Sequence, residues 1–171
     1  MNIRKKITLL LMLTLLASAS AQVRIPGTRL SFTLPDNEWK YLKTTTVDNN
    51  TTVYLYAYVA EYVLNQQGDT ILPFMRVFVQ KDYKGTVYDL AYSRFMKQPF
   101  QSLDEHVLDN GGLEYLGAYT NERDQIDYEF RMLYLKDQNT IFEIRLETTV
   151  DTFDSLEDSF DSIMKSVSIN K

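Results

Sequence analysis

The 171-residue sequence contains no cysteine and only one histidine, which narrows the chemistry open to it. Without cysteine the chain forms no disulfide, offers no thiolate to a metal or a substrate, and has no cysteine for lipid attachment. His106, the one histidine, would have to assist any histidine-dependent nucleophile, yet no Gly-x-Ser-x-Gly turn presents a serine. We therefore interpret His106 as an ordinary residue at the edge of a hairpin and predict no catalytic residue.

Metal and phosphate motifs are also missing. One histidine without cysteine would leave zinc to three carboxylates or waters, an unusual ligand set. Three oxygen-rich loops suit calcium chemically, but none fits the twelve-residue loop with acids at alternate positions, and Asp and Asn also favour turns. These loops are Asp48–Asn50, Asp109–Asn110 and Asp137–Asn139. Gly111 and Gly112 lack the following Lys-Ser/Thr pair of a phosphate-binding loop. We expect no cofactor and no metal, and leave calcium open.

Long apolar runs are absent beyond the first 21 residues, which have the pattern of a secretory signal peptide. A basic start, Met1–Lys6, precedes the apolar run Ile7–Leu16, and Ala19 and Ala21 fit the Ala-x-Ala site of a signal peptidase. We expect cleavage between Ala21 and Gln22. The alternative, an uncleaved membrane anchor, requires about 20 apolar residues to span the bilayer. The cleaved chain should be a soluble periplasmic or secreted protein with no lipid anchor and no membrane insertion.

Runs of basic residues are absent from the expected mature segment, residues 22–171. Removing residues 1–21 takes away three of the 18 basic residues and none of the 23 acidic ones, which leaves 15 against 23 and a net charge of −8. Nucleic acids and anionic lipids bind clustered Lys and Arg side chains. We therefore predict no nucleic-acid partner. No linker, repeat or low-complexity tract divides this segment, and we expect a single domain.

Alternating apolar residues predict a sheet of six or seven antiparallel strands. The segments are Arg29–Leu34, Thr51–Val59, Ile71–Gln80, Glu105–Leu108, Leu113–Thr120, Ile126–Tyr134 and Thr140–Val150. Two segments have the period of an amphipathic helix: Thr86–Lys97, ended by Pro99, and the segment from a predicted N-cap at Asp151 to Val167. These elements predict the α+β class, with a middle helix and a C-terminal helix packed on the sheet.

Three sets of residues along the chain carry a family resemblance. They are Gly27–Pro35 with Trp39, the hairpin through Gly111–Gly112 into Gly117–Tyr119, and Ile141–Leu146 followed by Phe153–Ile163 and Lys165–Val167. In this order they resemble the PsbP/Mog1-like family of small α/β/α sandwich domains, over residues 27–169. The main alternatives, cystatin-like and nuclear-transport-factor-like domains, place their long helix before most of the sheet. The resemblance implies a sandwich fold and, by analogy alone, a non-catalytic partner of a larger complex or an exported bacterial member of unassigned role.

Acidic residues on the last two predicted strands suggest a glycosidase pair, which needs two carboxylates about 5 to 10 Å apart across a cleft. The candidates are Asp127, Glu129, Glu143 and Glu147. They alternate with Arg131 and Arg145, so we interpret them as cross-strand ion pairs on a solvated sheet face. A carboxylate-dependent hydrolase of envelope glycans is kept as an alternative function.

Aromatic residues are the one excess, because 12 Tyr, nine Phe and one Trp make up 13% of the chain. Six residues of two predicted strands are expected on one face, opposite Val53, Leu55, Val77 and Val79. The six are Tyr54, Tyr56, Tyr58, Phe74, Arg76 and Phe78. They are core if the middle helix covers them; otherwise they have the composition of a protein-recognition surface.

The sequence thus favours an exported, non-catalytic binding or accessory domain. It would recognise an envelope protein or a small ligand through this aromatic surface. A structural module that assembles with itself through exposed strand edges is a further alternative.

Overall fold

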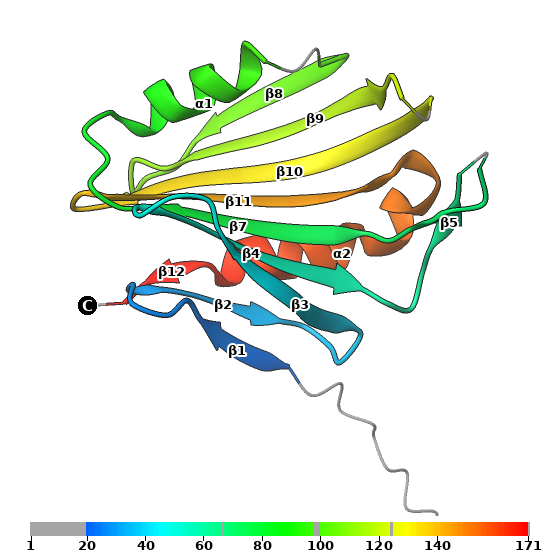
Figure 1. Cartoon of the computed structure of the whole chain (residues 1–171), viewed down its shortest axis with the longest axis horizontal. Coiled ribbons are helices and arrows are strands. Elements are labelled where there is room, and N and C mark those ends of the chain that lie inside the picture. The colour runs from blue at the N-terminus through cyan, green and yellow to red at the C-terminus, as the bar shows by residue number, and fades with distance from the viewer. Residues whose placement is uncertain (1–19, 66, 98–99, 124, 171) are drawn as a thin grey trace, which may run out of the picture.

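The computed structural model describes residues 20–65, 67–97, 100–123 and 125–170. Apart from Ser20 and Ala21, the predicted signal peptide lies outside these residues. The centre is a seven-stranded antiparallel sheet in the order β3-β4-β7-β11-β10-β9-β8 (Figure 1). Its strands are β3 (Trp39–Thr46), β4 (Thr51–Tyr58), β7 (Phe74–Gln80), β8 (Ser102–Val107), β9 (Leu113–Asn121), β10 (Ile126–Asp137) and β11 (Thr140–Thr149).

The large sheet has a layer on each side (Figure 1). On one side lie helix α2 (Val150–Ser166) and a small antiparallel sheet of β1 (Ala21–Arg24), β2 (Leu30–Leu34) and β12 (Ser168–Ile169). Helix α1 (Val87–Phe95) lies on the other. A short hairpin of β5 (Val63–Leu64) and β6 (Thr70–Ile71) stands apart. This arrangement confirms the predicted α+β sandwich.

The edge of the large sheet differs from the prediction. The predicted first strand, β2, pairs with β1 and β12 in the small sheet, and the edge position belongs to β3, which the sequence did not predict. Seven of the eight residues of β3 are exposed. A strand without a buried face carries no apolar alternation, so the pattern that reveals strands is missing from it.

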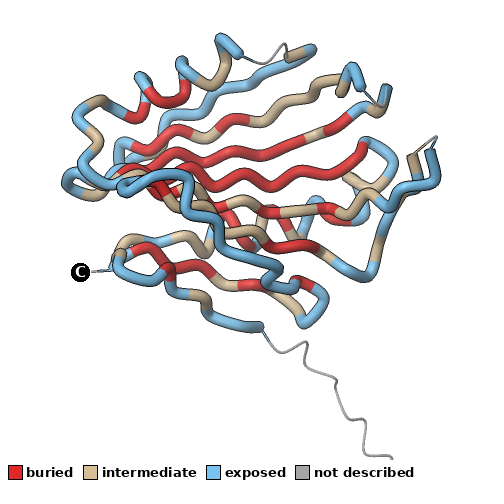
Figure 2. Tube along the Cα trace, viewed as in Figure 1, coloured by how far each residue is buried: buried red, intermediate tan, exposed pale blue. Residues whose placement is uncertain are grey.

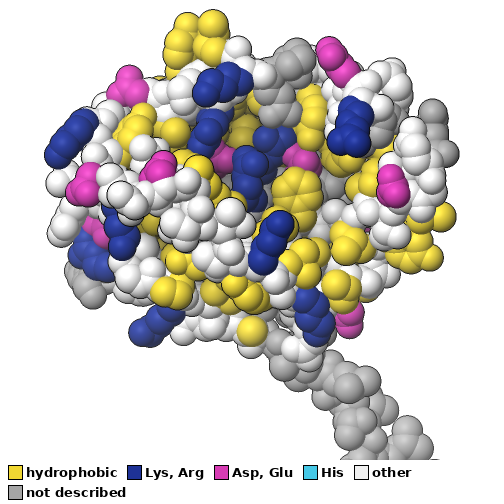
Figure 3. All heavy atoms as spheres, in the orientation of Figure 1, with side chains coloured by type: hydrophobic (Ala, Val, Ile, Leu, Met, Phe, Trp, Pro, Cys, Tyr) yellow, Lys and Arg dark blue, Asp and Glu magenta, His cyan; other side chains and the backbone are white. Residues whose placement is uncertain are grey.

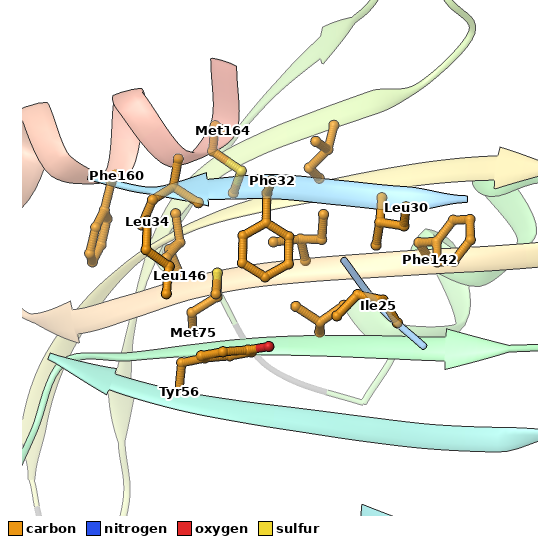
Figure 4. Packing of buried hydrophobic residues seen from close by; sticks show 14 of the residues in the cluster. Ile25, Leu30, Phe32, Leu34, Tyr56, Met75, Phe142, Leu146, Phe160 and Met164 are labelled. Carbon is orange, nitrogen blue, oxygen red and sulfur yellow. The ribbon is translucent and has the colours of Figure 1, made fainter. Parts of the chain in front are cut away.

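The main core lies between the large sheet and the layer of α2 and β2. Figure 4 shows Phe32 of β2, Met75 of β7, Phe142 of β11 and Phe160 of α2 pointing into the same space. The apolar stripe of α2 has the helical spacing of three and four residues that the sequence predicts, so the helix buries one face. Its buried residues are Leu156, Phe160, Ile163 and Met164. Burying each large apolar side chain contributes about 1.5 to 3 kcal/mol.

Helix α1 starts with a capping box. The Thr86 hydroxyl accepts a hydrogen bond from the Asp89 backbone N–H at 3.2 Å, and the Asp89 carboxylate accepts one from the Thr86 N–H at 2.7 Å. The predicted helix Thr86–Lys97 is confirmed in type and ends at Phe95; its predicted stop, Pro99, lies outside the described residues.

The coverage of α1 is partial. Its buried residues pack on a second apolar cluster from β9, β10 and the first residues of β11, and the border of this cluster reaches Phe78 of β7. Most of the same face over β7, β4 and β3 has no helix on it (Figure 1). Figure 2 shows the result: β10 and β11 are buried along most of their length, and the edge strands β3 and β8 are exposed.

Candidate functional site

The six residues predicted to form a recognition surface lie on opposite faces of the sheet. Residues directly paired across an antiparallel sheet point to the same side. Tyr56 pairs with Met75, which belongs to the main core, whereas Leu55 pairs with Arg76. The tyrosines therefore face α2 and β2, and Phe74, Arg76 and Phe78 face the side of α1. The expectation that all six share one face is wrong, because alternation orders the residues within a strand and the register between strands is a separate choice.

The three tyrosines belong to the main core or its border. Tyr56 is 5% exposed and packs edge-on against Phe32 of β2 at 5.8 Å between ring centroids. Tyr58 packs against Trp39 at 5.5 Å. Burial, followed by the neighbouring Tyr41 and Tyr54, raises the pKa of Tyr56 to about 12. The cover over Tyr56 is β2, and the middle helix is on the other side of the sheet.

The other three residues belong to a surface that we term the open face, the α1 side of β3, β4, β7 and β11 together with Arg94 of α1. Its residues are Lys40, Lys43, Val53, Leu55, Phe74, Arg76, Phe78, Arg94, Glu143, Arg145 and Glu147. Figure 3 shows this side of the molecule: basic side chains gather over the middle strands, with acidic and hydrophobic side chains between and beside them. The apolar members from β4 and β7 are half-buried.

Glu143 of β11 is the buried centre of the open face. Its side chain is 1% exposed and accepts hydrogen bonds from Arg76 Nη2 at 2.7 Å and from Arg94 Nε at 3.0 Å. The Arg94 guanidinium also lies 4.5 Å from the centroid of the Phe78 ring. Arg94 thereby ties α1 to β7 and β11, and both guanidinium groups are held in place.

A second buried pair follows two residues along β11. Arg145 forms an ion pair with Glu147, and the Tyr119 hydroxyl of β9 donates a hydrogen bond to Glu147 Oε1 at 2.9 Å. The Arg145 guanidinium lies 5.4 Å from the Tyr119 ring and 5.1 Å from the Phe130 ring. Burial, and next the charge of Glu147, raise the pKa of Tyr119. This group of charges is enclosed by aromatic rings.

The predicted solvated face of ion pairs is therefore wrong for β11, where Glu143, Arg145 and Glu147 are buried. Arg131 of β10 is buried as well, on the opposite face, where it pairs with Glu157 at 3.2 Å and with Asp161 of α2. A buried charge is tolerated only when it is paired. An alternation of charges along a strand is compatible with a solvated face and with buried ion pairs. Which of the two forms depends on the layer that covers the strand.

The four candidate glycosidase acids are not brought together. Asp127 and Glu129 lie on the α2 side of β10, as their neighbour in alternation, Arg131, does, and burial followed by nearby acids of α2 raises the pKa of Glu129. Glu143 and Glu147 lie on the α1 side beneath arginines. Both oxygens of Glu143 already accept hydrogen bonds from guanidinium groups. This geometry gives a substrate no access to the carboxylate pair.

His106 lies on the exposed strand β8, at the rim of a pocket of about 560 Å³ between α2 and β8–β10. The pocket wall combines apolar Leu116 and Leu133 with polar Glu114 and Lys165. The residues that line this pocket include no serine or threonine for His106 to assist. Within the described residues no group of three His, Asp or Glu side chains is placed to hold a metal.

The oxygen-rich loops use their side chains in turns and ion pairs. The Asp48 carboxylate accepts a hydrogen bond from the Asn50 N–H at 2.8 Å, and this backbone contact, with a side-chain bond from Thr51, lowers the pKa of Asp48. Asp137 pairs with Arg29 of the β1–β2 loop. These contacts account for Asp and Asn at these positions.

The two edges of the large sheet, β3 and β8, bear on the self-assembly alternative. The register of β3 shifts between Tyr41 and Lys43, and Lys40 and Lys43 are exposed on it. β-bulges and lysines on an edge strand discourage pairing with another chain.

Among the described residues, no helix has the length and hydropathy needed to cross a membrane.

Scans of protein-family models and of curated protein sequences find no match to this chain. Solved structures do match. The chain is similar to cyanobacterial PsbP (CyanoP) from Synechocystis sp. PCC 6803, with 16% identity over 89% of this chain and 93% of that one and a TM-score of 0.60. It is also similar to LpqN, involved in cell envelope biogenesis of Mycobacterium tuberculosis, with 13% identity over 90% and 91% of the chains and a TM-score of 0.57. The similarity shows the fold, which is the PsbP/Mog1-like sandwich expected from the sequence.

Proposed function

We propose that this PsbP/Mog1-like domain is an exported, non-catalytic binding or accessory domain that recognises an envelope protein through its open face. The observation that supports this most is the uncovered part of the sheet, where half-buried Phe74 and Phe78 flank Arg76 on a central strand. Aromatic residues and arginine are enriched in protein interfaces. Three of the six residues predicted from the sequence thus remain in the proposed surface, and Leu55 of β4 joins them.

The ion pairs beneath the open face give this surface a rigid base. Arg76 and Arg94 converge on the same buried carboxylate, Glu143. Side chains that are already ordered lose less conformational entropy when a partner binds. Because a buried ion pair adds little stability compared with an apolar replacement, its presence here is better explained by recognition than by folding.

Export is proposed on the pattern of residues 1–21. Cleavage after Ala21 would leave Gln22, Val23 and Arg24 of β1 paired with β2. LpqN, a structural neighbour, is described as involved in cell envelope biogenesis, which supports an envelope setting for the present domain. Mass spectrometry of the exported protein should find an N-terminus at Gln22; an N-terminus at Met1 would contradict the cleavage.

The proposed surface is tested by matched substitutions at two ends of the sheet. Leu55→Glu alters the open face, and Val107→Glu makes the same kind of change on the exposed strand β8. We expect an affinity-tagged full chain, recovered from its own envelope after cross-linking, to retain a partner with Val107→Glu and to lose it with Leu55→Glu. Equal recovery with both variants, or no partner with the unmodified chain, would contradict the proposal.

A further inference from the structure

We infer that the partner segment recognised by the open face is an acidic stretch of polypeptide carrying apolar side chains. This inference rests on the proposed function and specifies the chemistry of the partner. It derives from the distribution of charge on the folded surface. The sequence does not show this distribution, because the basic residues are scattered singly along the chain.

The open face is basic on an otherwise acidic molecule. It holds five basic residues, Lys40, Lys43, Arg76, Arg94 and Arg145, against the two acids Glu143 and Glu147, a net charge of +3. The remaining ten basic and 21 acidic residues of segment 22–171 give −11. A third of the basic residues of this segment therefore gather on one part of one sheet face.

The charges of the open face are also sorted by depth. The side chains of Glu143 and Glu147 are 1% and 5% exposed, whereas those of Arg76 and Arg94 are 37% and 35% exposed. Lys40 and Lys43 on β3 are exposed as well. The two carboxylates and Arg145 lie underneath and the other four cations face solvent, so a partner meets positive charge.

The arginines can bind further carboxylates. Arg76 and Arg94 each contact Glu143 through one nitrogen, and a guanidinium carries five N–H donors in a planar fork that matches a carboxylate. Each of the two side chains is about a third exposed, and each has further N–H donors besides the one that Glu143 accepts. A partner carboxylate is the group that this geometry suits.

Cross-strand register places apolar contacts among these cations. Lys43, Leu55, Arg76 and Arg145 form one row across β3, β4, β7 and β11, which spans about 14 Å at the usual strand spacing. The half-buried phenylalanines of β7 stand on either side of this row. A segment that mixes Asp or Glu with apolar residues matches both features.

A polypeptide segment fits better than an extended polyanion. Exposed charges are screened beyond about 8 to 10 Å at physiological ionic strength, so a short segment within the open face experiences its local charge of +3. A nucleic acid or an anionic membrane extends past the face and meets the surrounding acidic surface. The overall negative charge therefore opposes those partners without opposing a short acidic segment.

The test places a photo-cross-linking amino acid, p-benzoylphenylalanine, at Phe74 of the full chain in the producing cell. Cross-linked peptides are identified by mass spectrometry. We expect segments rich in Asp and Glu, and a fall of about tenfold in cross-linking yield when Lys40→Glu and Lys43→Glu are introduced together. The matched control, Arg24→Glu with Lys165→Glu, changes the net charge equally on the other side of the sheet and should leave the yield unchanged.

The outcomes separate the two proposals. Cross-links to neutral or basic peptides, to lipid or to glycan, or an equal fall in both double variants, would overturn the acidic segment and leave the open face as a binding surface. The absence of any cross-link at Phe74 would instead count against the proposed function, and the inference would fall with it.

Discussion

On one face of the seven-stranded sheet, α2 and β2 cover apolar side chains such as Met75 and Phe142; on the other, α1 covers only part of the surface and buried charges fill the middle of β11. Hydrophobic burial is non-directional and contributes in proportion to area. Ion pairs are directional and contribute little net stability over apolar replacements. The difference indicates that the α2 side contributes most of the stability, and it supports the proposal that the α1 side contacts a partner.

Strand β11, the middle strand of the large sheet, contributes buried side chains to both faces. Phe142, Ile144 and Leu146 point to the α2 side, and Glu143, Arg145 and Glu147 point to the α1 side, all of them buried. The same strand therefore carries both a hydrophobic row and a charged row. Substitutions of residues in each row, or of residues on the same side of the sheet, measure how much stability each face contributes.

The largest effect is expected at Phe160, which is fully buried and packs against the rings of Trp39 and Phe153 at 6.1 and 5.9 Å between centroids. Phe160→Ala should lower the free energy of unfolding by about 4 kcal/mol, because it removes a large side chain and leaves a cavity. Urea denaturation at neutral pH measures the change.

The control on the other face is Phe95→Ala. Phe95 of α1 is half-buried and packs against Phe100 and Tyr115 at 5.4 and 4.6 Å between centroids, and its loss should cost about 2 kcal/mol. Equal losses for Phe95→Ala and Phe160→Ala would show that both layers hold the fold equally, against the division between the faces.

The next largest effect is expected from Glu147→Ala. Arg145 would stay buried, with its side chain 9% exposed, without its carboxylate, and the Tyr119 hydroxyl would lose its acceptor. Leaving a buried charge without its partner should cost about 3 kcal/mol. Glu143→Ala should cost less, about 1 to 2 kcal/mol, because Arg76 and Arg94 are a third exposed and can turn to water.

A double replacement decides whether the ion pair itself stabilises the fold. Arg145→Met with Glu147→Leu removes both charges and keeps similar volume, so most of the stability lost in Glu147→Ala should return. If the double variant stays as unstable as Glu147→Ala, the pair is a net source of stability, and recognition is no longer needed to explain it. Urea midpoints of the three variants give the comparison.

The sequence predicted those parts of the fold that depend on periodicity within one segment. Alternation placed both ends of β11 to within one residue and the start of β10, although it ended β10 three residues early, at Tyr134. The stripe of Leu156, Phe160 and Ile163 identified the buried side of α2. Side chains of one segment reveal which of its faces is apolar. The pattern within one segment does not show which other element covers that face.

Apart from β3, which is exposed and carries no apolar alternation, the missed features depend on contacts between distant segments. The pairing of β2 with β12 joins residues such as Ser31 and Ser168, and sequence patterns do not encode that choice. The register of β4 on β7 divided the predicted aromatic surface, since a shift of one residue reverses every side chain. Arg94 shows the same limit for the site, because its contact with Glu143 exists only after α1 docks on the sheet.

The smallest effect is expected for Tyr56 at alkaline pH. It measures how far the fold buries this one side chain. An unfolded tyrosine titrates near pH 10, and in the fold burial, followed by Tyr41 and Tyr54, raises the pKa of Tyr56 to about 12. Above pH 10 the unfolded state therefore loses its proton first. The contribution of this group is complete below pH 10 and is lost as the pH rises to 12.

Between pH 8 and pH 10.5 the unmodified chain should thus lose about 0.8 kcal/mol more stability than Tyr56→Phe, as measured by urea denaturation at the two values. Tyr119→Phe on the other face should differ already at pH 8, by about 1 kcal/mol, because it removes the hydrogen bond to Glu147. Identical pH dependence of Tyr56→Phe and the unmodified chain would contradict the burial of Tyr56 under β2. In that case, Tyr56 and Tyr119 would no longer distinguish a face where the tyrosine contributes stability through burial from a face where it contributes through a hydrogen bond.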